Sequence, residues 1–248
     1  MTMSIKGNGK PIIFLPGLFA GGWIWDDVSC HLAKIGYSTI TFDQPIPDAF
    51  KGDIDYAIKM LEEAAALCEQ KPIIAGNSMG ALISLEFARR NPQAIESIIM
   101  SGAPGLEELE TGVSLAEVRT GELKYAQILA DRVFFDKSKV PVRGVEQIAN
   151  LFSDRRIFVN IARWLAFSRE YDVHGAFDQV SLPVKFIWGD HDLITPIEAW
   201  LKIFESHDNV ELNIVENSGH SPMLERPEIF AHYISDVIHQ EEEALVAC

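Results

Sequence analysis

Residues 71–90 read KPIIAGNSMGALISLEFARR. The stretch starts with a short apolar run, 72–75, that is typical of a buried strand, and continues after Met79 with apolar residues at helical spacing. Between the two lies Gly76-Asn77-Ser78-Met79-Gly80, which matches the pattern G-x-S-x-G. A strand that turns sharply into a helix at such a serine exposes the hydroxyl at the edge of a sheet. The stretch therefore predicts a nucleophilic Ser78, although a serine at this place can also be an ordinary helix N-cap.

Strands and helices alternate on both sides of this stretch. Short apolar runs predict strands at 12–15, 38–42, 72–75, 98–100, 184–188 and 210–215. Helical patterns lie between or after them at about 25–35, 53–70, 79–90, 196–205 and 227–243. Continuously apolar strands that are separated by helices indicate a parallel sheet covered on both faces. We therefore expect an α/β fold with a mostly parallel central sheet flanked by helices.

The alternation is interrupted between Gly105 and Asp178. This segment of about 70 residues carries helical patterns at 114–134, 143–152 and 154–169 and no convincing strand. We interpret it as a helical lid, residues 105–178, inserted into a core made of residues 1–104 and 179–248.

A nucleophilic serine needs a base, usually a histidine that a carboxylate orients. His220 lies in the turn 217–222, directly after the last predicted strand, where the carboxyl edge of an open sheet binds ligands. We therefore choose His220 as the base. The competing histidines lie in helices, at a helix end, at the return of the lid or beside the predicted acid: His31, His174, His191, His207, His232 and His239.

The acid is expected in Trp188-Gly189-Asp190-His191-Asp192, which follows the strand at 184–188. Asp192 is our first choice and Asp190 the second, the other carboxylate being a turn-forming residue. The run offers no metal site, and the three widely spaced cysteines, Cys30, Cys68 and Cys248, form neither a zinc pattern nor a disulfide framework.

The loop after the first predicted strand is rich in glycine. Residues 16–23 read PGLFAGGW, and glycines let backbone N–H groups turn inward. A tetrahedral oxyanion needs two such donors. We expect them to be the backbone N–H groups of Met79 and Leu18, with Phe19 as the alternative to Leu18. The glycines can also mark a plain flexible connection.

The charge of the chain restricts its partners. The 248 residues include 21 Lys and Arg against 36 Asp and Glu, for a formal net charge of −15. Such a surface disfavours nucleic acid and anionic membranes, which require clustered cations. The first ten residues lack the apolar core of a signal peptide, and the sparse cysteines suit a reducing compartment. We expect a soluble, cytoplasmic monomer or small homo-oligomer that acts on a small molecule.

Taken together, these stretches resemble the α/β-hydrolase superfamily, in the capped branch that contains esterases, lactonases and carbon–carbon bond hydrolases. The resemblance rests on residues 17–23, 76–80, 189–196 and 219–227, and on the place of the lid. It implies the chain order Ser78, Asp192, His220 for the catalytic residues, and it favours Asp192 as the fourth residue of the acid motif. Two stretches depart from the family pattern. Pro16-Gly17 replaces the usual His-Gly, and residues 43–48 lack the usual glycines.

The resemblance and the serine nucleophile together imply a cofactor-independent serine hydrolase. We expect it to cleave a carboxylic ester, thioester or lactone of a small, apolar or aromatic acyl group. Phe19, Trp23 and Trp164 are the candidate substrate-binding residues, although lid aromatics at helical spacing more often pack inside the lid. The lid arginines Arg155, Arg156, Arg163 and Arg169 could instead bind a substrate carboxylate. The alternatives are a carbon–carbon bond hydrolase of a vinylogous diketo acid and a non-catalytic small-ligand receptor.

Overall fold

A computed structural model describes residues 2–109 and 111–246, with side chains outside the stretch 237–246. Cys248 and the side chain of His239 therefore lie outside the described residues. The strands are β1 Met3–Lys6, β2 Lys10–Leu15, β3 Tyr37–Phe42, β4 Ile73–Asn77, β5 Ile98–Ser101, β6 Val184–Gly189 and β7 Val210–Val215. They form one seven-stranded sheet in the order β1-β3-β2-β4-β5-β6-β7. All neighbours are parallel except β1 and β3. The prediction of a mostly parallel α/β sheet is confirmed.

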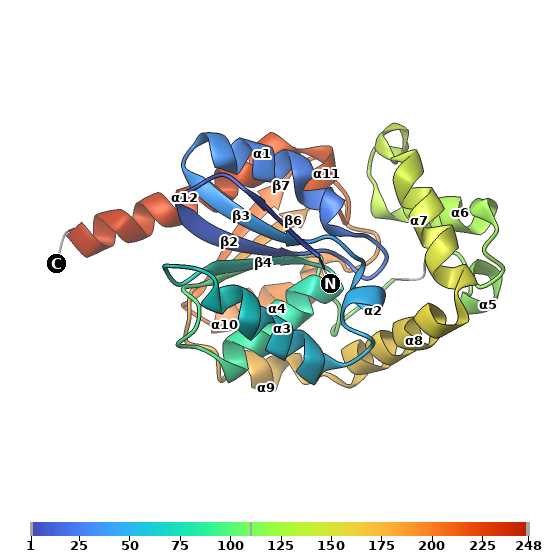
Figure 1. The fold of residues 1–248 in the computed structure, drawn as a ribbon, viewed down its shortest axis with the longest axis horizontal. Helices are drawn as coiled ribbons and strands as arrows, with labels where there is room; N and C mark the ends of the chain where they lie inside the picture. The colour runs from blue at the N-terminus through green and yellow to red at the C-terminus, as the bar shows by residue number, and fades with distance from the viewer. Residues whose placement is uncertain (1, 110, 247–248) are drawn as a thin grey trace.

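Side chains of successive strand residues enter two different cores, because they alternate across the sheet. Ile12 and Phe14 of β2 pack with α1 (Asp26–Lys34) and α12 (Pro227–Val246) on one face. Ile13 and Leu15 pack on the other face, which is covered by α3 (Ile54–Ala66), α4 (Met79–Arg90), α9 (Val173–Phe177) and α10 (Leu201–Ser206). Figure 1 shows these two helical layers above and below the sheet.

The edge strand β1 was not predicted. Its four residues are exposed or half-buried, so they give no apolar run. The strand forms because its backbone pairs antiparallel with β3, with Ser4 opposite Thr41. Other short elements were also missed: α2 Ile46–Ala49, α9, α11 Pro222–Glu225 and the 3-10 helix η1 Gly22–Trp25. Each is five residues or shorter, too short to show a period.

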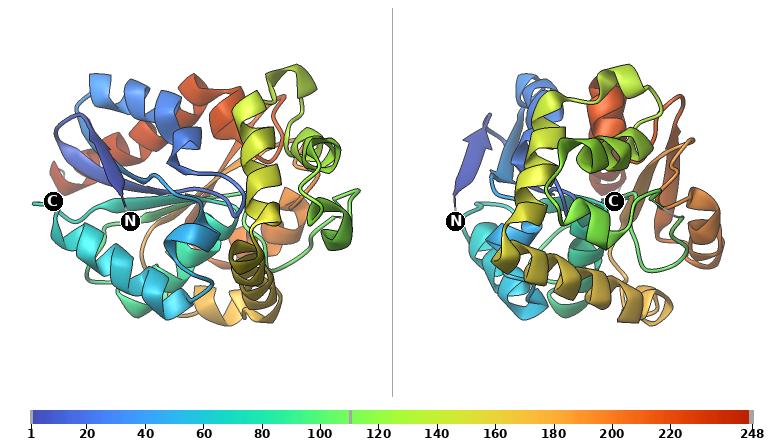
Figure 2. Two further views of the ribbon diagram at one scale, coloured as in Figure 1. Left: turned by 45° about the vertical axis from the view of Figure 1, so that its right-hand side comes forward. Right: turned by 90° about the vertical axis from the view of Figure 1, so that its right-hand side faces the viewer.

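Four helices and a short 3-10 turn cover the carboxyl ends of the strands. They are α5 Leu115–Val118, α6 Leu123–Val133, η2 Lys137–Lys139, α7 Val142–Ser153 and α8 Arg155–Glu170. Figure 2, right, shows them crossing in front of the sheet. The single helix expected at 114–134 is two helices, because Gly121 between them adopts φ +71°. The helix expected at 196–205 starts as the 3-10 helix η3 Ile197–Trp200 and continues as α10.

The segment that carries these helices leaves and rejoins the core at one place. The chain departs after β5, and a Cβ at Gly105 would lie 2.9 Å from a methyl carbon of Val173 at the start of α9. Helix α9 itself packs against α4, beside the core rather than over the carboxyl ends of the strands. Residues 105–172, called the lid, leave and return at adjoining points, while the division into a core and a lid at 105–178 stays a prediction.

Candidate active site

Ser78 stands at the turn between β4 and α4. Its φ of 54° and ψ of −124° lie in a region that a residue with a side chain rarely occupies. The backbone N–H of Ser78 donates to the carbonyl of Ser101 on the neighbouring strand at 2.8 Å. The side chain is half-buried and opens onto a cavity. The backbone is thus held in a strained turn that presents the hydroxyl.

Two glycines make this turn possible. A Cβ at Gly80 would lie 2.5 Å from the carbonyl oxygen of Pro16, at the end of β2. A Cβ at Gly76 would collide with the backbone of Gly80 and Ala81, the first turn of the helix that follows. For Gly76 the obstacle is instead its own helix, because the chain doubles back so sharply.

His220 and Asp192 form a buried pair. The imidazole Nδ1 lies 2.9 Å from Oδ2 and 3.1 Å from Oδ1 of Asp192. The side chains come from the loops after β7 and β6, and the residues are only 5% and 6% exposed. Gly102 stands against the imidazole, since a Cβ there would lie 2.8 Å from Cε1. The structure thus brings together the base and the acid that the sequence favours.

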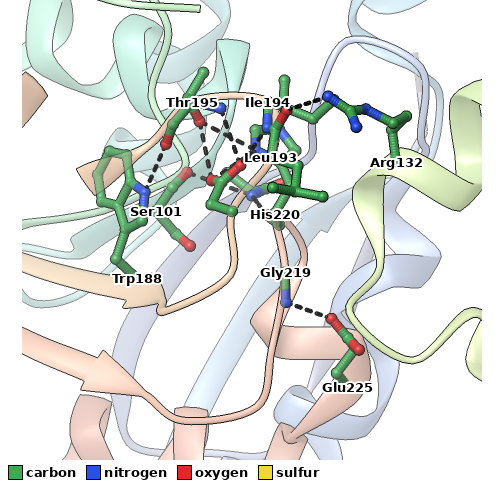
Figure 3. Close-up of polar contacts among 11 residues, drawn as sticks. Ser101, Arg132, Trp188, Leu193, Ile194, Thr195, Gly219, His220 and Glu225 are labelled. Carbon is green, nitrogen blue, oxygen red and sulfur yellow. Dashed lines mark hydrogen bonds and ion pairs between the residues drawn. The ribbon is translucent and has the colours of Figure 1, made fainter. Parts of the chain in front are cut away.

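Both oxygens of Asp192 accept further hydrogen bonds. The backbone N–H groups of Ile194 and Thr195 donate to Oδ1 at 2.9 Å each. The Thr195 hydroxyl donates to Oδ2 at 3.0 Å and lies 3.1 Å from Nδ1 of His220. Figure 3 shows Ile194 and Thr195 gathered around His220. Burial alone would raise the pKa of Asp192, but the His220 charge and these hydrogen bonds lower it. Asp192 is therefore an anion at neutral pH.

Asp190, the alternative acid, has other partners. It accepts a hydrogen bond from the backbone N–H of Ser218 at 3.2 Å, and Nδ1 of His191 lies 2.8 Å from it. Burial tends to raise the pKa of Asp190, while the bonds from His191, Ser218 and Asn217 outweigh burial and lower it. Its role here is to close the turn between the loops after β6 and β7.

The other described histidines lie away from Ser78. Three of them contact carboxylates at the surface: His31 with Glu228, His207 with Asp178 and His232 with Asp236. None of the histidines with a described side chain, apart from His220, lines the cavity that holds Ser78.

Leu18 and Met79, the predicted oxyanion donors, line the same cavity as Ser78. They are 5% and 2% exposed. Met79 is the first residue of α4, where the backbone N–H groups have no partner within the helix. Gly17 packs against the nucleophile, since a Cβ there would lie 3.4 Å from the Ser78 Cβ. Replacing the family's His-Gly by Pro16-Gly17 thus keeps the glycine that lets the loop approach.

Asn77 joins the nucleophile turn to the histidine loop. Its Nδ2 donates to the carbonyl of His220 at 3.0 Å and to that of Ser101 at 3.3 Å. Sequence reasoning did not assign a role to Asn77 or to Thr195. For Thr195 a weak signal existed, because an aspartate often accepts bonds from N–H groups two and three residues further on. Asn77 gave no signal, since its partner is 143 residues away.

The cavity has a volume of about 680 Å³ and lies between the carboxyl edge of the sheet and the lid. Phe19 and Trp23 line it as predicted. The Phe19 ring packs on Phe152 of α7 with centroids 5.1 Å apart, and the Trp23 indole donates to Gln147 of α7 at 2.6 Å. Further lining residues of the lid are mainly apolar: Leu106, Val118, Leu129, Ala130, Val133, Phe134, Val140, Ile148 and Leu165.

Trp164 does not line the cavity. It is 1% exposed and packs edge-on against Phe167 at 5.6 Å, inside the contact between lid and core. Of the four lid arginines named above, only Arg169 lines the cavity, and its side chain is exposed at the rim. The loop 43–48, which departs from the family pattern, leads into α2, and the Pro47 carbonyl there accepts from Asn160 of α8 at 2.9 Å.

The histidine loop is also bonded to the lid. The backbone N–H of His220 donates to the carbonyl of Val133, the last residue of α6, at 2.8 Å. The Glu225 carboxylate, 3% exposed, accepts from the backbone N–H groups of Gly219 at 2.6 Å, Phe135 at 3.2 Å and Asp136 at 2.9 Å. Figure 3 shows the bond between Glu225 and Gly219.

This arrangement can carry out acyl transfer without a metal ion. It places a serine, an imidazole and a buried carboxylate at the carboxyl edge of one sheet, next to backbone N–H groups and an apolar cavity. Within the described residues no cluster of His, Cys, Asp and Glu could hold a metal ion. In the same part of the chain, no helix has the length and apolarity to cross a bilayer.

The family model for the alpha/beta hydrolase fold matches residues 10–227, so the chain belongs to this family. Among curated proteins, it is 26% identical to a 2-hydroxy-6-oxononadienedioate/2-hydroxy-6-oxononatrienedioate hydrolase of Dechloromonas aromatica. That alignment covers 94% of this chain and 88% of the relative.

Solved structures agree on the fold. A meta-cleavage product hydrolase of Pseudomonas fluorescens superposes with a TM-score of 0.79 at 18% identity, covering 97% of this chain and 94% of the other. An esterase of Exiguobacterium antarcticum gives a TM-score of 0.76 at 19% identity, over 96% and 94% of the two chains. The protein is therefore an alpha/beta hydrolase, and its fold is similar to that of a meta-cleavage product hydrolase and of an esterase.

Proposed function

We propose that the protein is a serine hydrolase that cleaves a carboxylic ester, thioester or lactone with a small apolar or aromatic acyl group. One observation carries this proposal: strained Ser78 and His220, which is paired with the buried Asp192, line the same apolar cavity. The apolar lid residues around that cavity favour an apolar acyl group over a charged one.

The proposed reaction has two halves. The Ser78 hydroxyl attacks the carbonyl carbon while His220 takes its proton, and Asp192 stabilises the imidazolium through Nδ1. The N–H groups of Leu18 and Met79 bind the oxyanion. His220 then protonates the leaving alcohol or thiol, which leaves an acyl group on Ser78. A water molecule, deprotonated by His220, attacks this acyl group and releases the acid and the free serine.

Covalent labelling tests the nucleophile directly. The native protein is treated with a fluorophosphonate and the modified residue is located by intact mass and peptide mapping. We expect one label at Ser78, absent in Ser78→Ala and retained in Ser84→Ala, which removes a buried hydroxyl of the same helix. A panel of p-nitrophenyl esters of increasing acyl length then ranks substrates. A folded protein that neither takes the label nor turns over esters contradicts the proposal and favours a ligand receptor.

Carbon–carbon bond hydrolysis of a vinylogous diketo acid is the second candidate, because a relative is named as a hydrolase of a 2-hydroxy-6-oxononadienedioate. Arg169 at the rim of the cavity could bind the carboxylate of such a substrate. Against it, Ser221 follows the histidine, where these enzymes usually have tryptophan. The two candidates are separated by comparing kcat/KM on an aryl 2-hydroxy-6-oxodienoate and on p-nitrophenyl butyrate. A higher value on the dienoate would favour the second candidate.

A further inference from the structure

Glu225 is a buried carboxylate that the reaction above does not use. It ends the short helix α11, five residues after His220. Its carboxylate accepts hydrogen bonds from the backbone N–H groups of Gly219, Phe135 and Asp136. Burying a carboxylate is costly unless hydrogen bonds compensate it. Because Glu225 is nevertheless buried, the carboxylate and these three N–H groups together form a built site.

The three N–H groups belong to two different parts of the molecule. Gly219 directly precedes His220, whereas Phe135 and Asp136 belong to the lid, just after α6. One oxygen, Oε1, accepts from Gly219 and Phe135 together, and Oε2 accepts from Asp136. Oε1 of Glu225 thus joins the main chain beside His220, the proposed base, to the main chain of the lid.

Two further contacts tighten this junction. The His220 N–H donates to the Val133 carbonyl at 2.8 Å, and Lys139 of the lid donates to the Glu225 carbonyl at 2.8 Å. There is no room for a side chain at Gly219, since a Cβ there would lie 2.5 Å from the Val133 oxygen. Residues 133–139 and 219–225 are therefore held together at both ends.

We propose that Glu225 is a positioning residue: it fixes the main chain of His220 against lid residues 133–136, so that a shift of the lid there shifts the base. This inference rests on the proposed function in that it takes His220 as the base. Without the carboxylate, Gly219 N–H and the two lid N–H groups lose their acceptor, and the bonds of His220 to Val133 and Asn77 must hold this part of the loop without the support of the bond at Gly219. A displacement of about 1 Å in a catalytic group can cost about 100-fold in rate.

The test compares Glu225→Ala and Glu225→Gln with Glu86→Gln. Glutamine keeps one carbonyl oxygen but turns an NH₂ group toward one of the N–H donors, so it satisfies only part of the junction. Glu86 is the matched control: it is also a 3% exposed carboxylate, and it bonds Tyr171 at the far end of the lid, but its recorded partners lie outside the histidine loop. Urea unfolding first establishes that each variant is folded.

Kinetics and NMR then provide the readouts. On p-nitrophenyl butyrate we expect Glu225→Ala to lose about 100-fold in kcat with little change in KM, Glu225→Gln to lose less, and Glu86→Gln to keep the native kcat. The downfield Nδ1–H resonance of His220, assigned by its absence in His220→Gln, should move or broaden in the Glu225 variants only.

Native kcat and an unmoved resonance in folded Glu225→Gln would overturn the inference, as would an effect on KM alone, which would indicate a lid effect on binding. If the unmodified protein hydrolyses no ester, the proposed function fails, while the resonance still decides whether Glu225 positions His220.

Discussion

The hydroxyl of Thr195 is placed to fix the orientation of Asp192. It donates to Oδ2 of Asp192 at 3.0 Å, while the backbone supplies the donors for Oδ1. We predict that Thr195→Val lowers kcat about tenfold with little change in KM, because a hydrogen bond to a charged group contributes about 1.5–3 kcal/mol. Thr195→Ser, which keeps the hydroxyl, should restore most of the rate. Equal rates in the serine and valine variants, measured on one ester, would contradict this role.

Gly80 is needed because a side chain there meets backbone. A Cβ would lie 2.5 Å from the Pro16 carbonyl oxygen, which cannot move aside as a flexible side chain would. We predict that Gly80→Ala lowers the free energy of unfolding by about 1–3 kcal/mol, the usual cost of overpacking.

A second variant, Gly36→Ala, measures the cost of the backbone conformation without this steric cost. Its φ is +93°, and a Cβ there would meet nothing within 4 Å. Gly36→Ala should therefore lose only the conformational term, about 1–2 kcal/mol. Urea unfolding of the two variants measures both. If Gly80→Ala leaves the free energy of unfolding unchanged, the packing argument is wrong.

At the scale of single residues, the sequence predicted the candidate site residues that are marked by a local pattern. Ser78 has its glycines, and Asp192 and His220 each follow a strand, so their meeting was foreseeable. Glu225 could not be assigned, because its partners Phe135 and Asp136 are 90 and 89 residues away in sequence. The position of Trp164 was predicted wrongly for a related reason. Helical spacing shows which residues share one face of a helix, but not which part of the molecule that face contacts.

An ion cluster connects α4, the helix behind the nucleophile, to the end of α8. Glu86 of α4 accepts from Arg89 and Arg90 on its own helix and from the Tyr171 hydroxyl at 2.8 Å. Burial alone would raise the pKa of Glu86, but these bonds outweigh burial and lower it. Burial and the negative charge of Glu86 raise the pKa of Tyr171 well above its usual range.

These directions predict how stability depends on pH. A carboxylate with a lowered folded pKa stabilises the fold above its unfolded pKa of about 4.3, and this contribution is lost as pH falls through the lower folded value. The difference in unfolding free energy between the native protein and Glu86→Gln should therefore be largest above about pH 5 and shrink in acid. Urea unfolding at a series of pH values measures it, with Glu63→Gln, at an exposed position of α3, as the charge control. A difference that is constant with pH would refute the prediction.

At the scale of elements, periodicity located the long helices and the buried strands. Periodicity failed where a single residue or a distant strand determines whether a helix or strand forms. Gly121 divides the expected helix 114–134, and β1 exists only through its pairing with β3. Neither effect leaves a mark in the hydrophobic pattern.

For the whole molecule, the volume between lid and sheet should set the range of acyl groups. Gly144 of α7 lines the cavity, and a Cβ there would make ordinary contact with Trp23 at 3.4 Å. We predict that Gly144→Leu fills part of the cavity and lowers kcat/KM roughly tenfold for long acyl esters relative to acetate. Gly144→Ala is the control, since it adds one methyl group and favours the helix. An unchanged length preference in Gly144→Leu would mean that this end of the cavity is not used.

The lid leaves after β5 and returns at α9, and these two points touch at Gly105 and Val173. Since β5 and β6 are parallel neighbours, the connection between them needs only a crossover helix, and α9 lies in that position. The lid is thus an excursion from a connection that is complete without it. Recombination at two adjoining points can exchange such a segment for another of different shape and leave every strand register intact. The cavity wall and the proposed catalytic core can therefore evolve as separate modules, with the Glu225 junction among the contacts that a transplanted lid would have to rebuild.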